Sequence, residues 1–239
     1  MKIKRVSDAT SRSFKMRLCH VSDTHGGFPR LFGRYDAVLH TGDFFPNSQW
    51  VRVGDKVKEA EYQLQWLKDN ISNLKQQLQG HPYFFILGNH DFVSPEKVEE
   101  VLLDTGVLAF NLTDKFVLYN GVTFYGFPYI PAIGGNHWNY EREIPEMQVE
   151  VDKMVGVLNL NQIDVLACHA PISNCLDLSL SNQVLGSGVI AHALNYKIKT
   201  EMLPKYYCHG HIHEANGLTT RNGILISNAA TTFHIIEVG

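Results

Sequence analysis

The apolar residues of this chain fall into short runs typical of buried strands and into one long stretch with helical spacing. Short apolar runs at residues 17–22, 36–40 and 83–87 predict three strands in the first half. Between the second and third runs, apolar side chains recur at three- and four-residue steps through residues 55–79. This spacing predicts a long helix, which Gly80 and Pro82 should end. A second helix is expected to begin at Ser94, with Pro95 in its first position.

The second half of the chain is richer in strands. Apolar runs at 116–120 and 122–127 are separated by Asn120-Gly121, a dipeptide that favours a hairpin turn. The remaining expected elements are a helix near 145–158, a strand at 163–168, a short helix near 188–195, a strand at 206–209, and strands around 224–227 and 232–238. This order predicts an α/β protein in which two sheets pack face to face with helices outside.

Size and composition limit the classes of protein to consider. The chain has 239 residues, 44% of them hydrophobic, and we expect a basic N-terminal extension at 1–15 before a single domain at 16–239. A net charge of −3 argues against long nucleic acid as the main ligand, although a small or single-stranded one stays open. No apolar run approaches the roughly 18 residues that cross a bilayer. The four cysteines form no C-x-x-C pair, and the three in predicted strands, Cys19, Cys168 and Cys208, are expected to be buried; together these features favour a cytoplasmic protein.

Five polar clusters follow the predicted strands and carry the chemistry of the chain. They are Asp23-Thr24-His25, Gly42-Asp43, Gly88-Asn89-His90-Asp91, His169, and His209-Gly210-His211-Ile212-His213. Sites in α/β proteins form just past the carboxyl ends of strands, so these side chains are expected to meet at a sheet edge. Carboxylates, an amide and imidazoles suit Mn, Fe, Co, Ni or Zn.

The ordered set resembles the signature of the calcineurin-like metallophosphoesterases, D-x-H, G-D, G-N-H-[DE], H and G-H-x-H, over nearly the whole chain from residue 16. The resemblance implies a four-layer α/β/β/α sandwich with two mixed sheets. It also implies two divalent metal ions, with Mn²⁺ as the first choice. The first ion would be held by Asp23, His25, Asp43 and His213, and the second by Asn89, His169 and His211 together with Asp43, which bridges the two.

The same resemblance assigns the reaction. It implies in-line attack on phosphorus by a hydroxide that bridges the ions. His90 would protonate the leaving oxygen, and Asp91 would hold its imidazole in the right tautomer and raise its pKa. The partner would be a small phosphate ester or nucleotide, with no role for a membrane.

Two features favour phosphodiesters over phosphomonoesters. The Ser/Thr phosphatase branch places arginines after G-D and before G-N-H, where this chain has Phe44-Phe45-Pro46-Asn47 and Leu87. An arginine guanidinium can donate two hydrogen bonds to the dianion of a phosphomonoester, so the absence of these arginines favours diester substrates. Several stretches, among them Tyr125-Gly126-Phe127-Pro128, resemble the small brain-type metallophosphoesterase-domain subgroup, which implies cyclic nucleotide diesters, including 2′,3′-cyclic species. We also expect Asn136, His137 and Trp138 to border the cleft and stack a base.

Other interpretations stay open at this point. A nuclease or a phosphomonoesterase would share the motifs, and a non-catalytic protein-binding scaffold would share the fold. Outside the motifs, His20, His81, His192 and His234 are interpreted as structural core residues. His40 is either structural or a residue that orients a ligand, and His209 is ambiguous.

Overall fold

Five strands form the first sheet, in the spatial order β13-β1-β2-β3-β4. The computed structural model describes residues 15–133 and 138–239. The strands are β1 (Met16–Val21), β2 (Ala37–Thr41), β3 (Tyr83–Ile86), β4 (Ala109–Asn111) and β13 (Phe233–Val238). The first four are parallel neighbours, so their carboxyl ends share one edge, whereas β13 runs antiparallel to β1.

Six strands form the second sheet, in the order β11-β12-β10-β9-β6-β5. They are β5 (Phe116–Tyr119), β6 (Val122–Phe127), β9 (Val165–Cys168), β10 (Tyr206–His209), β11 (Gly217–Arg221) and β12 (Ile224–Asn228). The four inner strands are parallel, and the two edge strands pair antiparallel. A separate short pair joins β7 (Ile130–Pro131) to β8 (Glu141–Arg142).

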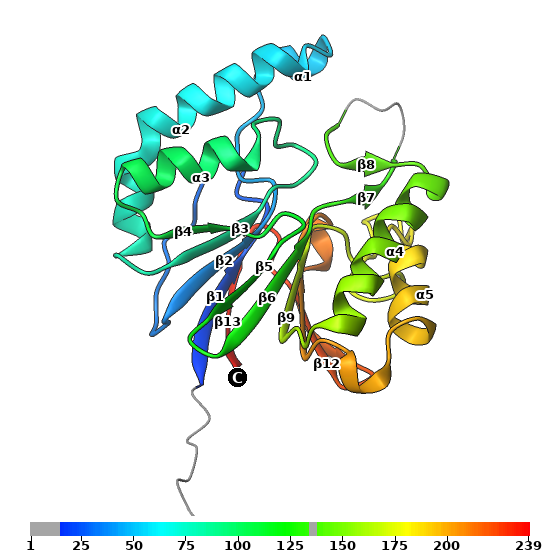
Figure 1. The fold of residues 1–239 in the computed structure, drawn as a ribbon. Coiled ribbons are helices and arrows are strands. Elements are labelled where there is room, and N and C mark those ends of the chain that lie inside the picture. The colour runs from blue at the N-terminus through cyan, green and yellow to red at the C-terminus, as the bar shows by residue number, and fades with distance from the viewer. Residues whose placement is uncertain (1–14, 134–137) are drawn as a thin grey trace, which may run out of the picture.

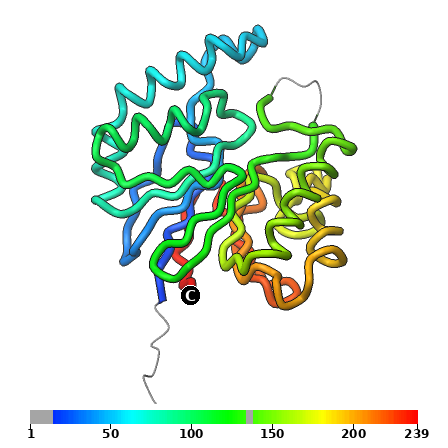
Figure 2. Tube along the Cα trace, in the orientation of Figure 1, coloured from blue at the N-terminus to red at the C-terminus, as the bar shows by residue number. Residues whose placement is uncertain are grey.

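Helices cover the outer face of each sheet (Figure 1). On the side of the first sheet lie α2 (Lys56–Leu78) and α3 (Pro95–Asp104), and on the side of the second lie α4 (Ile144–Leu160) and α5 (Gly188–Tyr196). The short elements are α1 (Gln49–Arg52), η1 (Thr200–Met202) and η2 (His213–Ala215). Figure 2 shows the C-terminal strand returning beside the first strand of the chain. Among the described residues, no helix has the length and apolarity needed to cross a bilayer.

Three apolar layers hold these four layers of structure together. Between the sheets, Leu18, Leu39 and Phe124 belong to one buried cluster. A second cluster joins the first sheet to α2 and α3, and a third joins the second sheet to α4 and α5. The predicted sandwich of two mixed sheets between outer helices is therefore confirmed.

Local signals in the sequence placed most of the boundaries correctly. Asp55 caps α2 by accepting a hydrogen bond from the backbone N–H of Lys58, and Ser94 caps α3 in the same way at Lys97. At the predicted hairpin, Asn120 and Gly121 both have positive φ. Strands β4 and β11 were not predicted, because β4 has only three residues and β11 alternates half-buried with exposed positions. Cys19, Cys168 and Cys208 are free and buried, as expected, and so is Cys175.

Candidate metal centre

The candidate site lies where the carboxyl ends of five strands meet. Asp23 and His25 follow β1, Asp43 follows β2, and Asn89 follows β3, three neighbours in the first sheet. The second sheet contributes His169 after β9, and His211 and His213 after β10. The structure thus brings together all seven residues that the sequence singled out as metal ligands.

The backbone around these residues is unusual. Asp23, His25, Asp43 and His211 all have positive φ, at 54°, 43°, 56° and 73°. Non-glycine residues rarely adopt this conformation, and each costs on the order of 1–3 kcal/mol. At Gly88, a Cβ atom would lie 2.2 Å from Asp43 Oδ1, so only glycine allows this approach. Backbone strain concentrated in the loops at one edge of a sheet is typical of a functional site.

Asp43 is the central acceptor of the site. Its Oδ2 lies 3.4 Å from His169 Nε2 and 4.0 Å from Nε2 of both His25 and His90. Its Oδ1 accepts a hydrogen bond of 2.8 Å from the backbone N–H of His90. The carboxylate is 2% exposed, so these partners replace water.

Asp23 and Asn89 occupy opposite flanks of this centre. Asp23 Oδ1 lies 3.3 Å from His213 Nε2, and both Asp23 oxygens accept from the backbone N–H of His211. On the other flank, the Asn89 side-chain oxygen lies 2.9 Å from His169 Nε2. Two separate groups of donors result, one around Asp23 and one around Asp43.

The mutual fields of these groups shift their pKa values strongly. Burial by itself would raise the pKa of Asp43, but the imidazoles of His169, His90 and His25 outweigh it and hold the pKa well below its usual range. Burial opposes protonation of His169, yet the Asp43 carboxylate outweighs it and raises the pKa to about 9. Burial, and then the nearby His169, lowers the pKa of His211 to about 3. Carboxylates that stay ionised beside imidazoles that can be neutral are suited to a cation.

The donor set fits two divalent ions. Asp23, His25 and His213 can place one ligand atom each within 4.8 Å of one another, and so can Asp43, His169 and His211. A third such group of His25, Asp43 and His90 joins the first two. Oxygen and imidazole donors in these numbers suit first-row ions such as Mn or Zn rather than Ca²⁺, which takes oxygen ligands.

His90 reaches the centre, but its partner is not the one that the sequence suggested. Its Nε2 faces Asp43, while the side-chain nitrogen of Asn47 lies 2.7 Å from its Nδ1. The prediction that Asp91 holds this imidazole is wrong. The buried Asp91 carboxylate accepts instead from the backbone N–H groups of Phe44, Phe45 and Gly88.

The pKa consequences of this arrangement also differ from expectation. Burial lowers the pKa of His90, whereas the sequence suggested a raised value. Burial, followed by the charge on Asp43, raises the pKa of Asp91 to about 7. Through its three backbone hydrogen bonds, Asp91 links the loop that carries Asp43 to the loop that carries Asn89.

Trp138 packs on the imidazole of His90, one of the residues around Asp43. Its ring centroid is 3.9 Å from that of His90, with the planes 34° apart. The neighbouring Asn139 donates from its backbone to the carbonyl of Asn89, and from its side chain to the carbonyl of Asp91. The other two residues expected at the cleft, Asn136 and His137, lie outside the described residues.

The remaining histidines divide into structural and supporting roles. His40 is buried, accepts from the backbone N–H of Gly42 and lies 3.1 Å from Thr24 Oγ1, so it supports the loops that carry Asp23 and Asp43. His20 is buried between Ser227 and Thr41, as a structural residue should be. His192, in contrast, is exposed on α5. His209 is buried, and its Nε2 has no hydrogen-bond partner within residues 15–133 and 138–239.

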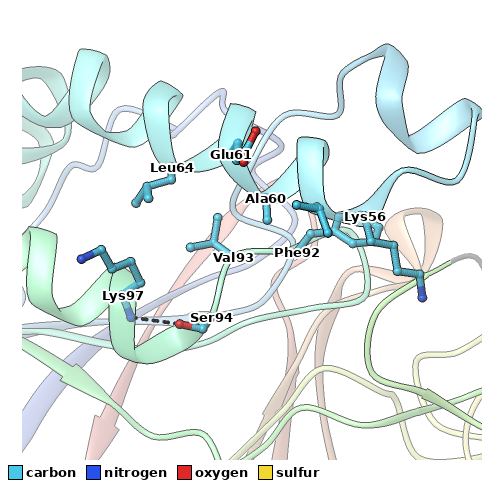
Figure 3. A pocket seen from close by; sticks show the side chains of 9 residues that line it. Lys56, Ala60, Glu61, Leu64, Phe92, Val93, Ser94 and Lys97 are labelled. Carbon is cyan, nitrogen blue, oxygen red and sulfur yellow. Dashed lines mark hydrogen bonds between the residues drawn. The ribbon is translucent and has the colours of Figure 1, made fainter.

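An open groove of about 460 Å³ lies between α2 and the segment that leads into α3 (Figure 3). Its floor includes Ala60, Leu64 and Val93, with Lys56 and Lys97 toward its ends. None of the seven candidate ligands lines it. Two of its lining residues contact Trp138 beside the centre: the ring centroid of Phe92 is 6.5 Å from that of Trp138, and Lys56 donates to the carbonyl of Trp138.

Sequence reasoning missed two buried polar residues of α2 that support the site. Glu59 and Gln63 are fully buried and lie on the same helical face as Leu67 and Leu74. The apolar spacing had suggested Val57 for this stripe, but Val57 is 70% exposed. The available signal was the four-residue step from Glu59 through Gln63 to Leu67, which places both polar residues in phase with the core.

Comparisons with known proteins identify the family and the fold of this chain. The model of the family described as calcineurin-like phosphoesterase matches residues 16–215. UPF0046 protein C25E10.12 from Caenorhabditis elegans is 24% identical over 237 residues, covering 92% of this chain and 76% of that protein. UPF0046 protein T07D4.2, from the same organism, is 26% identical over 112 residues, or 47% of this chain and only 26% of that protein. One solved structure aligns with 90% of both chains at a TM-score of 0.68 and 13% identity, which is a likeness of fold.

Proposed function

This chain belongs to the calcineurin-like phosphoesterase family, and from that starting point we propose that it hydrolyses phosphodiester bonds of small nucleotides, using two divalent metal ions. The observation that carries this proposal is the position of Asp43. Its carboxylate takes part in two of the three donor groups, and its Oδ2 lies 3.4 Å from His169 Nε2. A single carboxylate shared by two sets of imidazoles is the arrangement that a pair of ions a few ångströms apart requires.

The residues around Asp43 have distinct tasks. Asp23, His25 and His213 would hold one ion, and Asn89, His169 and His211 the other, with Asp43 common to both. When bound, such ions supply Lewis-acid activation of the phosphoryl group and a nucleophile at neutral pH. His90 presents Nε2 toward this region, where its N–H group can hydrogen-bond to the leaving oxygen and steady the charge that develops there.

The residues at the arginine positions of the Ser/Thr phosphatase branch support a diester substrate. Phe44 and Phe45 after Gly42-Asp43, and Leu87 before Gly88, are all buried in the core between the first sheet and its helices. Apolar side chains that face the core cannot form the ion pairs that would stabilise the second negative charge of a phosphomonoester. A diester carries one negative charge less and needs fewer such contacts.

Cyclic nucleotides, including 2′,3′-cyclic species, are the proposed substrates within the diester class. The support is the resemblance to the brain-type subgroup and the aromatic side chain of Trp138 beside His90. A base stacked on an aromatic ring contributes about 1–3 kcal/mol. Mn²⁺ is the proposed first choice of ion.

The test uses metal-free protein reloaded separately with Mn²⁺, Co²⁺, Ni²⁺ or Zn²⁺. The substrates are an aryl phosphodiester, the matching monoester, 2′,3′- and 3′,5′-cyclic nucleotides, and single-stranded DNA. We expect metal-dependent turnover with kcat/KM for the diester well above that for the monoester. A higher kcat/KM for the monoester or for single-stranded DNA would show that the proposed substrate class is wrong. Absence of turnover in protein that binds two ions would support the scaffold interpretation.

A further inference from the structure

We infer that Asn47 is a positioning residue for His90, held in place by a pair of buried polar side chains on α2. This inference rests on the proposed function, because it assigns the residue that orients the imidazole of His90 toward the reacting phosphoryl group. Three observations carry it: the contact between Asn47 and the imidazole, the anchoring of both loops on α2, and the direction in which the imidazole then points.

The contact itself decides which ring nitrogen of His90 bears the proton. The side-chain nitrogen of Asn47 lies 2.7 Å from Nδ1, and an amide N–H group can only donate. Nδ1 must then accept, so the neutral imidazole carries its proton on Nε2. That nitrogen lies 4.0 Å from Asp43 Oδ2, on the side of the candidate ligands. The proton of the neutral ring thus faces the place where a leaving oxygen would be.

Helix α2 anchors both ends of this contact. Gln63 donates to the backbone carbonyl of His90 at 2.8 Å and accepts from the backbone N–H of Phe92 at 2.7 Å, so it clamps the loop on both sides of Asp91. One turn earlier, Glu59 accepts from both the backbone N–H and the hydroxyl of Ser48, the residue next to Asn47. Because Glu59 and Gln63 sit on one rigid helix, the two loops keep a fixed spacing.

Trp138 restricts the imidazole from a further direction. Its ring packs against that of His90 at a centroid distance of 3.9 Å, and its carbonyl accepts from Lys56 at 3.3 Å, near the start of α2. Rotation of the imidazole away from Asp43 would have to break the Asn47 contact and disturb this packing. The side chain of Asn47 is exposed and has no part in the core, which makes it open to substitution.

The tautomer of His90 gives a test that needs no turnover. In protein with ¹⁵N-labelled histidine, long-range ¹H–¹⁵N spectra distinguish Nδ1–H from Nε2–H, in the metal-free form and in the diamagnetic Zn²⁺ form. We expect the Nε2–H tautomer in the wild type and a mixture of tautomers in Asn47→Ala. A wild-type Nδ1–H tautomer, or identical spectra in the two proteins, would overturn the inference even if the enzyme is active.

Kinetics on the loaded enzyme form the second arm. Asn47→Ala should lower kcat by about ten- to a hundredfold, a part of the 10²–10³ that one hydrogen-bond donor to a developing oxyanion typically contributes, with KM changed less than about threefold. The loss should be larger for an alkyl than for an aryl leaving group, because more negative charge develops on the poorer leaving oxygen. The matched control is Asn195→Ala, which removes an exposed amide that accepts a hydrogen bond of 3.0 Å from Asn222. This substitution should leave kcat and KM unchanged.

The double variant separates positioning from direct action. If Asn47 acts through His90, Asn47→Ala should have no further effect on kcat in a His90→Ala background. An equal loss in both backgrounds would show that Asn47 contacts the substrate and would overturn the inference. If the wild type hydrolyses none of the phosphate esters, the proposed function fails, while the spectra still decide whether Asn47 sets the tautomer.

Discussion

His169 lies 2.8 Å from the backbone carbonyl of Thr41 through Nδ1, and this contact turns its Nε2 toward the interior of the site. A carbonyl oxygen can only accept, so Nδ1 keeps its proton and Nε2 is the nitrogen that can gain or lose one. In the metal-free protein Nε2 faces Asp43 at 3.4 Å, which is why the pKa of His169 is raised to about 9 despite complete burial. A cation at the site must therefore displace this proton.

Metal binding should consequently release a proton at neutral pH. Below pH 9 most His169 is protonated in the metal-free protein, whereas the ligand form is neutral, so apparent affinity should rise with pH toward about 9. One such proton gives about a tenfold gain in affinity per pH unit. Calorimetry in two buffers with different ionisation enthalpies measures the proton count directly. Affinity that does not change between pH 7 and 9 would contradict this assignment.

Asp43→Asn should abolish turnover and lower the content of bound metal. The asparagine amide lacks the negative charge that both groups of metal ligands share. The loss of metal affinity should therefore exceed the roughly 10- to 100-fold loss that is typical when a hydrogen-bond partner of a metal ligand is removed. Elemental analysis of the purified variant gives the metal content, alongside rates with an aryl phosphodiester. Asp152→Asn, whose exposed carboxylate pairs with Lys197 at 2.7 Å, is a control for the same chemical change. A variant with normal turnover would remove Asp43 from the central position.

His90→Asn should separate catalysis from metal binding. Its Nε2 lies 4.0 Å from Asp43, and the sequence motif assigns it to proton donation rather than to either ion. We expect kcat to fall by about 10²- to 10⁴-fold, with two ions still bound. Loss of one equivalent of metal would instead make His90 a ligand, consistent with its place in the third donor group.

Gln63→Leu should lower both stability and kcat. The substitution leaves the carbonyl of His90 and the N–H of Phe92 without their partner, which costs about 1–3 kcal/mol of unfolding free energy. Urea denaturation followed by circular dichroism measures the loss. Gln65→Leu on the exposed face of the same helix breaks only a bond to Asp69 and should change stability by less than about 0.5 kcal/mol. Equal effects of the two variants would argue against the clamp.

Trp138→Ala distinguishes the two roles that its position allows. If Trp138 stacks a base, KM should rise more for cyclic nucleotides than for a small aryl diester. If it acts only by packing on His90, kcat should fall similarly for both substrates. Steady-state kinetics with both substrates decides between these, and equal KM changes would exclude base stacking.

The sequence by itself determined the order of the chemical groups and the elements that present them. Each motif directly follows an apolar run that forms a strand. Because the carboxyl ends of neighbouring parallel strands lie at the same edge of a sheet, Asp23, Asp43 and Asn89 are expected to lie together there. Caps and breakers such as Asp55 and Gly80 act within a few residues, which is why the boundaries of α2 could be predicted within a residue or two.

The tertiary structure alone decided which distant groups became partners. Strand β13 pairs with β1 across the full length of the chain, and no local pattern encodes that choice. The roles of Glu59 and Gln63 could not be predicted from the helix alone, because the backbone groups with which they form hydrogen bonds lie on other loops. Adjacency in sequence suggested Asp91 as the partner of His90, yet the turn after β3 directs that carboxylate toward three backbone N–H groups and leaves the imidazole to Asn47. Side-chain direction depends on the backbone turn, which only the folded chain fixes.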